Sequence, residues 1–122
     1  MTTVEIANKL TNLCKQGKDH EALALYAADA ISVEASMPPG MDRVSRGVAA
    51  IQAKAKWFYD NHTIHSAVVV AGPWPHDDRF IVGFKMDVTF KPTGVRSTME
   101  EMGLYTVKNG KIVSEEFFYT GG

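Results

Sequence analysis

The sequence has little of what marks several specialised classes of protein. It holds one cysteine, Cys14, among 122 residues, which excludes an internal disulfide and a zinc site built from several cysteines. Its longest apolar run, Ala67–Gly72, is far shorter than the ~20 residues that a membrane helix needs. We therefore expect neither disulfide bonds nor a membrane partner.

Neither sign of charge is in large excess. The 13 basic and 14 acidic residues leave a net charge of −1 and form no basic stripe, which argues against nucleic acid as a partner. The first residues, Met1–Glu5, lack the basic and apolar regions of a signal peptide. With 45% hydrophobic residues, we expect one globular domain, residues 1–122, in the cytoplasm.

Three helices are predicted in the first half of the chain. Thr2 and Glu5 have the spacing of a capping box, and apolar residues then recur at helical spacing until Gly17. Asp19 can cap a shorter helix, Asp19–Tyr26, and a third helix is predicted over Gly47–Tyr59. After this third helix the sequence pattern predicts strands.

Alternating apolar and polar residues, separated by turn residues, predict the strands. These are Ala30–Ala35, His65–Ala71, Arg79–Phe90, Arg96–Val107 and Lys111–Tyr119. Asn109-Gly110 is typical of a type I′ hairpin turn, in which both central residues have positive φ. Helices segregated from antiparallel strands predict an α+β fold, with three N-terminal helices packed on a strongly curved antiparallel sheet.

Several segments lie in the order and at the spacing of a known family. They are Tyr26–Ala30 leading into Val33-Glu34, then Arg46–Ile51, Gly72-Pro73 and Tyr105–Ile112. The sequence resembles a nuclear transport factor 2-like domain, the fold that ketosteroid isomerases share, and most closely its SnoaL-like polyketide cyclase branch. The resemblance spans residues 4–119 and implies a cone-shaped half-barrel whose internal pocket admits a small apolar molecule.

The resemblance also implies a function. It points to an isomerase- or cyclase-type enzyme that performs acid–base chemistry on a carbonyl or polycyclic compound, with no metal and no cofactor. The alternative is a non-catalytic module of the same fold, which binds a small ligand or dimerises. Members of this superfamily often form homodimers through the outer sheet face, where Lys85, Asp87, Thr89 and Phe118 are expected.

Glu34 is the first candidate catalytic residue. It falls at or beside the general base of ketosteroid isomerases, which removes a proton next to a carbonyl. Strand alternation decides its direction: it faces inward if Ala30 and Ser32 do, and outward if Ile31 and Val33 do. The bulk of Ile31 and Val33 favours a Glu34 that faces water.

Glu100 and Glu101 are the next candidates, because adjacent residues of a strand point to opposite faces. Without a bulge, the hairpin places Met102 opposite Phe117 and Glu100 opposite Tyr119, and this register makes Glu100 the pocket residue. The other register puts Glu101 inside. A carboxyl group among apolar side chains is desolvated, which raises its pKa, and when protonated it can donate a hydrogen bond to an oxyanion.

His65 is a candidate proton shuttle, since the pKa of histidine lies near 6.5. His62 precedes it by three residues, but at the junction of a helix and a strand, and no third ligand completes a metal site. Large apolar or amphipathic side chains complete the predicted pocket, with core filling as the alternative role. The predicted ligand-binding residues are Tyr26, Trp57, Met86, Val88, Met102, Phe117 and Tyr119.

Overall fold

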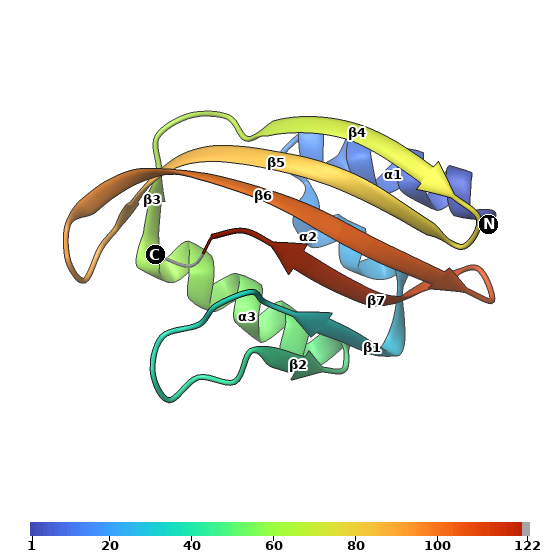
Figure 1. The fold of residues 1–122 in the computed structure, drawn as a ribbon, viewed down its shortest axis with the longest axis horizontal. Coiled ribbons are helices and arrows are strands. Elements are labelled where there is room, and N and C mark those ends of the chain that lie inside the picture. Colours follow the sequence, from blue (N-terminus) through green and yellow to red (C-terminus); the bar gives the residue numbers. More distant parts are fainter. Residues whose placement is uncertain (121–122) are drawn as a thin grey trace.

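The computed structural model describes residues 1–120 (Figure 1). The helices are α1 (Thr3–Lys15), α2 (Asp19–Ala22), the 3-10 turn η1 (Leu23–Leu25) and α3 (Val48–Asn61). The capping box at the start of α1 is confirmed: Thr2 Oγ1 accepts from the Glu5 amide at 3.2 Å, and Glu5 Oε1 accepts from the Thr2 amide at 2.9 Å. None of the helices in residues 1–120 has the length and apolar character needed to span a membrane.

Seven strands form one curled sheet. They are β1 (Tyr26–Val33), β2 (Val44–Arg46), β3 (His62–Ile64), β4 (Val69–His76), β5 (Arg79–Phe90), β6 (Val95–Lys108) and β7 (Lys111–Phe118). Their order is β2-β1-β7-β6-β5-β3, with β4 also paired to β5. The predicted α+β fold is confirmed, but the sheet is mixed, because β1 and β7 run parallel. No hairpin joins those two strands, so nothing forces them to be antiparallel.

The helices lie on one face of the sheet, which Figure 1 shows in front of them. α1 packs against β4 and β5, whereas α3 packs against β1 and β2. The densest core lies beneath α1 and α2, where Phe80 and Tyr105 stack with ring centroids 4.8 Å apart. The core therefore occupies one part of the concave face and leaves the part near α3 available for a cavity.

The hairpin between β6 and β7 has the predicted turn but not the predicted register. Asn109 and Gly110 have φ values of 52° and 74°, as a type I′ turn requires. A bulge in the pairing of Thr106 and Val107 then shifts the strands by one residue, so Met102 lies opposite Phe118. The predicted pairing of Met102 with Phe117 is wrong for this reason.

The strand predicted to end at Ala71 instead continues through Gly72–Pro75 to His76, within β4. The strand pairs with β5 on both sides of this segment, with a register shift between Ala71 and Trp74. Gly72 has a φ of 94°, a conformation that glycine adopts readily. Here the glycine and proline mark an irregularity within a strand and not its end.

Candidate functional site

A cavity of about 760 Å³ lies between the concave face of the sheet, the helices and the loop that follows β1. Much of its wall is apolar: Trp57, Phe58, Phe84, Met86, Met99 and Phe117 line it. Three glutamates and one lysine from the strands and α3 also reach the cavity: Glu34, Glu101, Glu115 and Lys54. The site therefore combines an apolar wall with a small group of ionisable side chains.

Glu34 faces the cavity, contrary to the expectation from side-chain bulk. Ala30 and Ser32 are fully buried, and Glu34 continues their side of the strand. Ile31 and Val33 lie half-buried on the other side. Helix α3 packs against β1 on this side, where Lys54 of α3 donates a hydrogen bond to Ser32, and Glu34 therefore lies beneath α3 as well.

The Glu34 carboxylate has two partners. Its Oε1 accepts from Lys54 Nζ at 2.9 Å, and its Oε2 lies 3.0 Å from the Tyr119 hydroxyl. The same hydroxyl lies 2.8 Å from the Ser36 carbonyl oxygen and accepts from the Ser36 amide at 3.3 Å. Burial, reinforced by the negative Glu34, raises the pKa of Tyr119 to about 12. Tyr119 is thus held as a neutral phenol at the rim of the cavity.

Sequence reasoning missed Lys54, although a signal for it exists. Ile51, Ala55 and Phe58 recur at helical spacing on the inner face of α3, and Lys54 falls within the same stripe. A lysine in an apolar stripe is either at the rim of a core or paired inside it. Here it is paired, and its side chain is 14% exposed.

Glu101 is the acid of the Glu100-Glu101 pair that lines the cavity. It lies opposite Phe84 on β5, and its partly exposed carboxyl group forms no hydrogen bond or ion pair within residues 1–120. Burial and the nearby acids Glu34 and Glu115 raise its pKa to about 7, although Lys54 acts in the opposite direction. At neutral pH this carboxyl group is therefore divided between its two protonation states.

Glu115 is the most buried of the three acids, at 4% exposure. The Tyr26 hydroxyl donates a hydrogen bond to its Oε2. Burial raises the pKa of Glu115, and the hydrogen bond from Tyr26 and the charge of Lys54 partly offset this. Glu115 was not a predicted site residue, but it shares a strand face with Phe117, which was.

The family model of the SnoaL-like domain matches residues 1–119. The chain belongs to the SnoaL-like family. No functionally curated protein matches this SnoaL-like domain.

Solved structures agree with this assignment. A proposed SnoaL-like polyketide cyclase of Mesorhizobium loti, whose description also names carbohydrate phosphatase, is 48% identical, with a TM-score of 0.90 over 98% of this chain and 100% of that chain. A Burkholderia pseudomallei NTF2-like protein of unknown function is 18% identical, with a TM-score of 0.75 over 98% and 92%. A proposed isomerase of Bacillus subtilis is 19% identical, with a TM-score of 0.73 over 98% and 90%. The last two likenesses show the shared fold alone.

The SnoaL-like domain brings most of the predicted ligand-binding side chains together. Tyr26, Trp57, Met86, Phe117 and Tyr119 all line the cavity. Two others do not. Val88 is buried without lining it, and Met102 is 41% exposed on the outer face, where the bulge in the hairpin places it.

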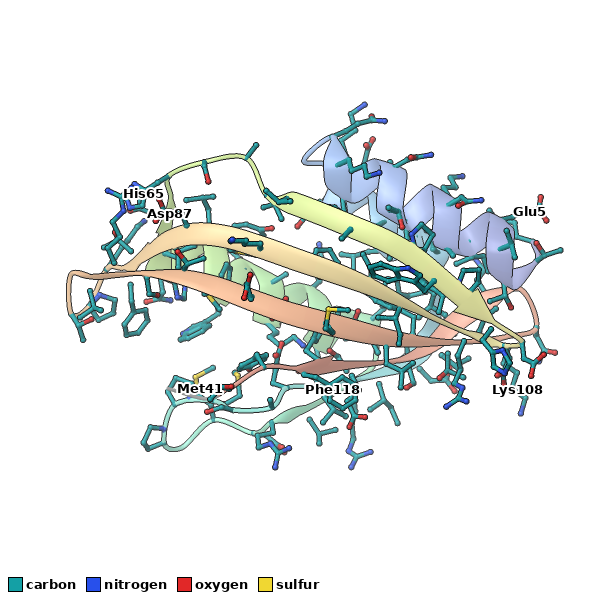
Figure 2. The ribbon with its side chains drawn as sticks, turned by 45° about the horizontal axis from the view of Figure 1, so that its top comes forward. Glu5, Met41, His65, Asp87, Lys108 and Phe118 are labelled. Carbon is teal, nitrogen blue, oxygen red and sulfur yellow. The ribbon has the colours of Figure 1, made fainter. Side chains whose placement is uncertain are left out.

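Two predicted catalytic residues lie outside the cavity. Glu100 is on the outer face, with its side chain 71% exposed and its Oε1 3.6 Å from Lys85 Nζ, because the register makes Glu101 the inward residue. His65 follows the end of β3, where its Nε2 lies 2.6 Å from Thr89 Oγ1. Figure 2 shows His65 beside Asp87, at the end of the sheet far from Lys108. His65 is not among the residues that line the cavity.

His62 lines the cavity, but its ring is held in place by contacts with Phe58. Its ring stacks on Phe58 with centroids 4.1 Å apart, and its Nδ1 lies 2.8 Å from the Phe58 carbonyl oxygen. Across residues 1–120, no three His, Cys, Asp or Glu side chains are grouped so that they would hold a metal ion.

Proposed function

We propose that this SnoaL-like domain is an acid–base enzyme of isomerase or cyclase type, acting on a small, largely apolar carbonyl or polycyclic compound. The observation that carries the proposal is Glu101: an unpaired carboxyl group in an apolar cavity wall, with a pKa raised to about 7 by burial and by neighbouring acids. A group with this pKa can accept a proton and return it at neutral pH, as general acid–base catalysis requires.

The cavity suits such a compound in size. Its volume of about 760 Å³ lies within the range of roughly 300–1,000 Å³ that small-molecule pockets occupy. In the proposed reaction, the Glu101 carboxylate takes a proton from the carbon next to the carbonyl, and the electrons of the C–H bond move onto the oxygen. Return of the proton to a different carbon completes an isomerisation. Alternatively, the enolate carbon attacks a second carbonyl and closes a ring, and the alkoxide formed there takes the proton back from Glu101.

The charge of the cavity makes a phosphorylated substrate a poor fit. Four acidic side chains face two basic ones in its lining: Asp19, Glu34, Glu101 and Glu115 against Lys15 and Lys54. A phosphate monoester carries nearly two negative charges near neutral pH, and one of the two basic side chains, Lys54, is already paired with Glu34, so the lining offers too little positive charge to match it. The proposal therefore follows the cyclase part of the description of the Mesorhizobium loti relative and not the phosphatase part.

A container without turnover is the competing function, and one observation favours it. The Glu34 carboxylate, which the sequence suggested as the base, is already held by Lys54 and Tyr119. An apolar cavity alone is sufficient to bind a ligand. The two functions differ in whether Glu101 exchanges protons with the ligand.

Proton exchange in D₂O tests the proposal directly. The protein would be incubated with a panel of small cyclic ketones and 1,3-diketones, and ¹H NMR would follow the loss of the protons next to the carbonyl. We expect exchange above the buffer rate, reduced roughly 100-fold or more in E101Q. E100Q is the matched control, because it changes the adjacent outward-facing acid, and it should exchange at the wild-type rate.

Equal exchange rates in the wild type and E101Q would contradict the enzymatic function. Binding is measured separately through the fluorescence of Trp57, which lines the cavity, in a W74F background that removes the second tryptophan. Saturable binding without any catalysed exchange would support the container.

A further inference from the structure

Lys54 is a cavity residue that the proposed proton transfer leaves unused. It belongs to α3, and its side chain is 14% exposed. Its ammonium group lies 5.3 Å from the centroid of the Phe117 ring, on the apolar wall. A cation in such a place interacts strongly with any charge that develops on a bound ligand, since little water screens the interaction.

Two of the three N–H groups of the Lys54 ammonium donate hydrogen bonds to the part of the protein that the structure describes, and the third does not. An ammonium group carries three N–H donors. Glu34 Oε1 accepts one at 2.9 Å, and Ser32 Oγ accepts another. Within residues 1–120 no third oxygen or nitrogen accepts from Lys54, so one N–H is free for a molecule in the cavity that Lys54 lines.

Several other donors in the cavity lining are already committed, and Lys15, the second lining cation, is exposed to solvent at the end of α1. The Tyr26 hydroxyl donates to Glu115, and the single Tyr119 proton is shared between Glu34 and the Ser36 carbonyl oxygen. Tyr105 also lines the cavity and makes no side-chain hydrogen bond within residues 1–120, but it is neutral and stacked on Phe80 in the core. A charged donor stabilises an anion more strongly than a neutral one.

We propose that Lys54 is the oxyanion-stabilising residue of this site: it donates a hydrogen bond to the ligand's carbonyl oxygen as Glu101 removes the proton. This inference rests on the proposed function. The C–H bond breaks, an O–H bond forms on Glu101, and the negative charge that leaves Glu101 reaches the ligand oxygen beside Lys54. Lys54 stays protonated throughout and supplies charge and a hydrogen bond.

The surrounding residues hold Lys54 ready for this role. Ser32 in β1 and Glu34 just after it fix the ammonium group, and Tyr119, which follows β7, fixes the second oxygen of Glu34. A donor that is already oriented needs no reorganisation when charge appears on the ligand, and this makes it effective in catalysis. Ser32 and Glu34 are thus positioning residues, which act through Lys54.

A coloured phenol tests Lys54 without any turnover. Bound 4-nitrophenol would be titrated by absorbance in the wild type and in K54M, which keeps the length of the side chain and removes its charge. We expect a phenolate-to-phenol ratio at least tenfold higher in the wild type at the same pH, because Lys54 stabilises the anion. K85M, on the outer face, should behave as the wild type does.

Equal ionisation of the bound phenol in the wild type and K54M would overturn the proposal. So would a large loss of phenolate in Y105F together with none in K54M, since Tyr105 would then be the donor. If K54M alone does not fold, the double variant E34Q/K54M removes both partners of the ion pair and leaves no unpaired buried charge.

Proton exchange adds a kinetic readout. K54M should lower the exchange rate on the ketone panel roughly 100-fold, and K54R should restore part of it. Because Lys54 lowers the pKa of Glu101, K54M should also move the midpoint of the pH–rate profile to higher pH. This shift follows from the charge of Lys54 alone, so the role in oxyanion stabilisation is read from the rate that K54M loses and K54R partly restores. Exchange that survives E101Q would refute the proposed function, while the phenol titration would still decide the role of Lys54.

Discussion

Glu100 and Glu101 are consecutive in β6, yet their side chains lie on opposite faces of the sheet. Glu100 is exposed and lies near Lys85, whereas Glu101 is paired opposite Phe84 and lines the cavity. Two carboxyl groups one residue apart are thus in different environments, one in water and one in the cavity. E100Q and E101Q make the same chemical change, but only E101Q alters the cavity.

The first prediction concerns the pH dependence of stability. Burial raises the pKa of Glu101 from 4.5 to about 7, so between these values the unfolded state releases a proton that the folded state keeps. The free energy of unfolding should therefore fall as pH rises from 4.5 to 7, by at most about 3 kcal/mol from this residue, and level off above pH 7. Urea unfolding at several pH values measures it.

Two variants show whether Glu101 is the source. E101Q should lose stability less steeply than the wild type between pH 4.5 and 7, because glutamine does not ionise. E100Q should keep the wild-type slope. Parallel curves for E101Q and the wild type would show that Glu101 titrates in the folded protein as it does in the unfolded chain.

The second prediction concerns the hydrogen bond between Tyr26 and Glu115. Y26F keeps the ring and removes the donor, so the buried Glu115 carboxyl group loses the hydrogen bond from Tyr26. We expect a loss of about 1–3 kcal/mol in the free energy of unfolding. The pKa of Glu115, read by ¹³C NMR, should rise further, because the Tyr26 hydrogen bond now lowers it.

Y119F is the comparison for this prediction, because it removes a hydroxyl of the same kind at the rim of the cavity. Its effect on stability should be smaller, since the Tyr119 hydroxyl is less deeply buried than that of Tyr26 and water can replace its contacts. Equal losses in Y26F and Y119F would mean that burial of the Glu115 pair adds nothing.

Local signals were sufficient for much of the fold. The capping box of Thr2 and Glu5 marks the start of α1, and Arg79–Phe90 was predicted with the bounds of β5. The turn at Asn109-Gly110 has the predicted positive φ values. Each of these features depends on residues close together in the chain, and short-range patterns describe such features well.

Long-range packing decided what the sequence left open. Strand β1 carries small residues on one face and Ile31 and Val33 on the other, and α3 covers the face with the small residues, which turns Glu34 inward. No local sequence pattern marks the bulge near Thr106, but the bulge decides which residue of β6 pairs with which residue of β7. The directions of Glu34 and Glu101 therefore depended on contacts between distant segments.

The third prediction concerns the outer face of the sheet. Met102 and Phe118 lie directly opposite each other there and are 41% and 49% exposed. The face carries both signs of charge, including the pair of Asp87 with Arg96 at 2.7 Å, so a rotated second copy can place its acids near the bases of the first. We propose a homodimer through this face, as the family resemblance implied.

Sedimentation at micromolar concentration tests the homodimer. The wild type should sediment as a dimer and F118K as a monomer, because a lysine at the centre of the interface would be buried without a partner. V4K, an equally large change at an exposed position of α1, should leave the dimer intact. A monomeric wild type, or a dimer that F118K does not disturb, would refute the proposal.

The fourth prediction tests how closely the cavity wall is packed. A Cβ atom on Gly103 would lie 2.7 Å from Tyr105 Cε2 and 3.1 Å from Phe117 Cε1, so G103A must displace both rings. We expect a loss of about 1–3 kcal/mol in stability and weaker ligand binding, because Phe117 lines the cavity. G83A is the control, since its Cβ would first meet the flexible Met102 sulfur at 3.3 Å, on the outer face. Urea unfolding and Trp57 fluorescence measure the two effects, and a G103A protein as stable as G83A would show that the rings have room to move.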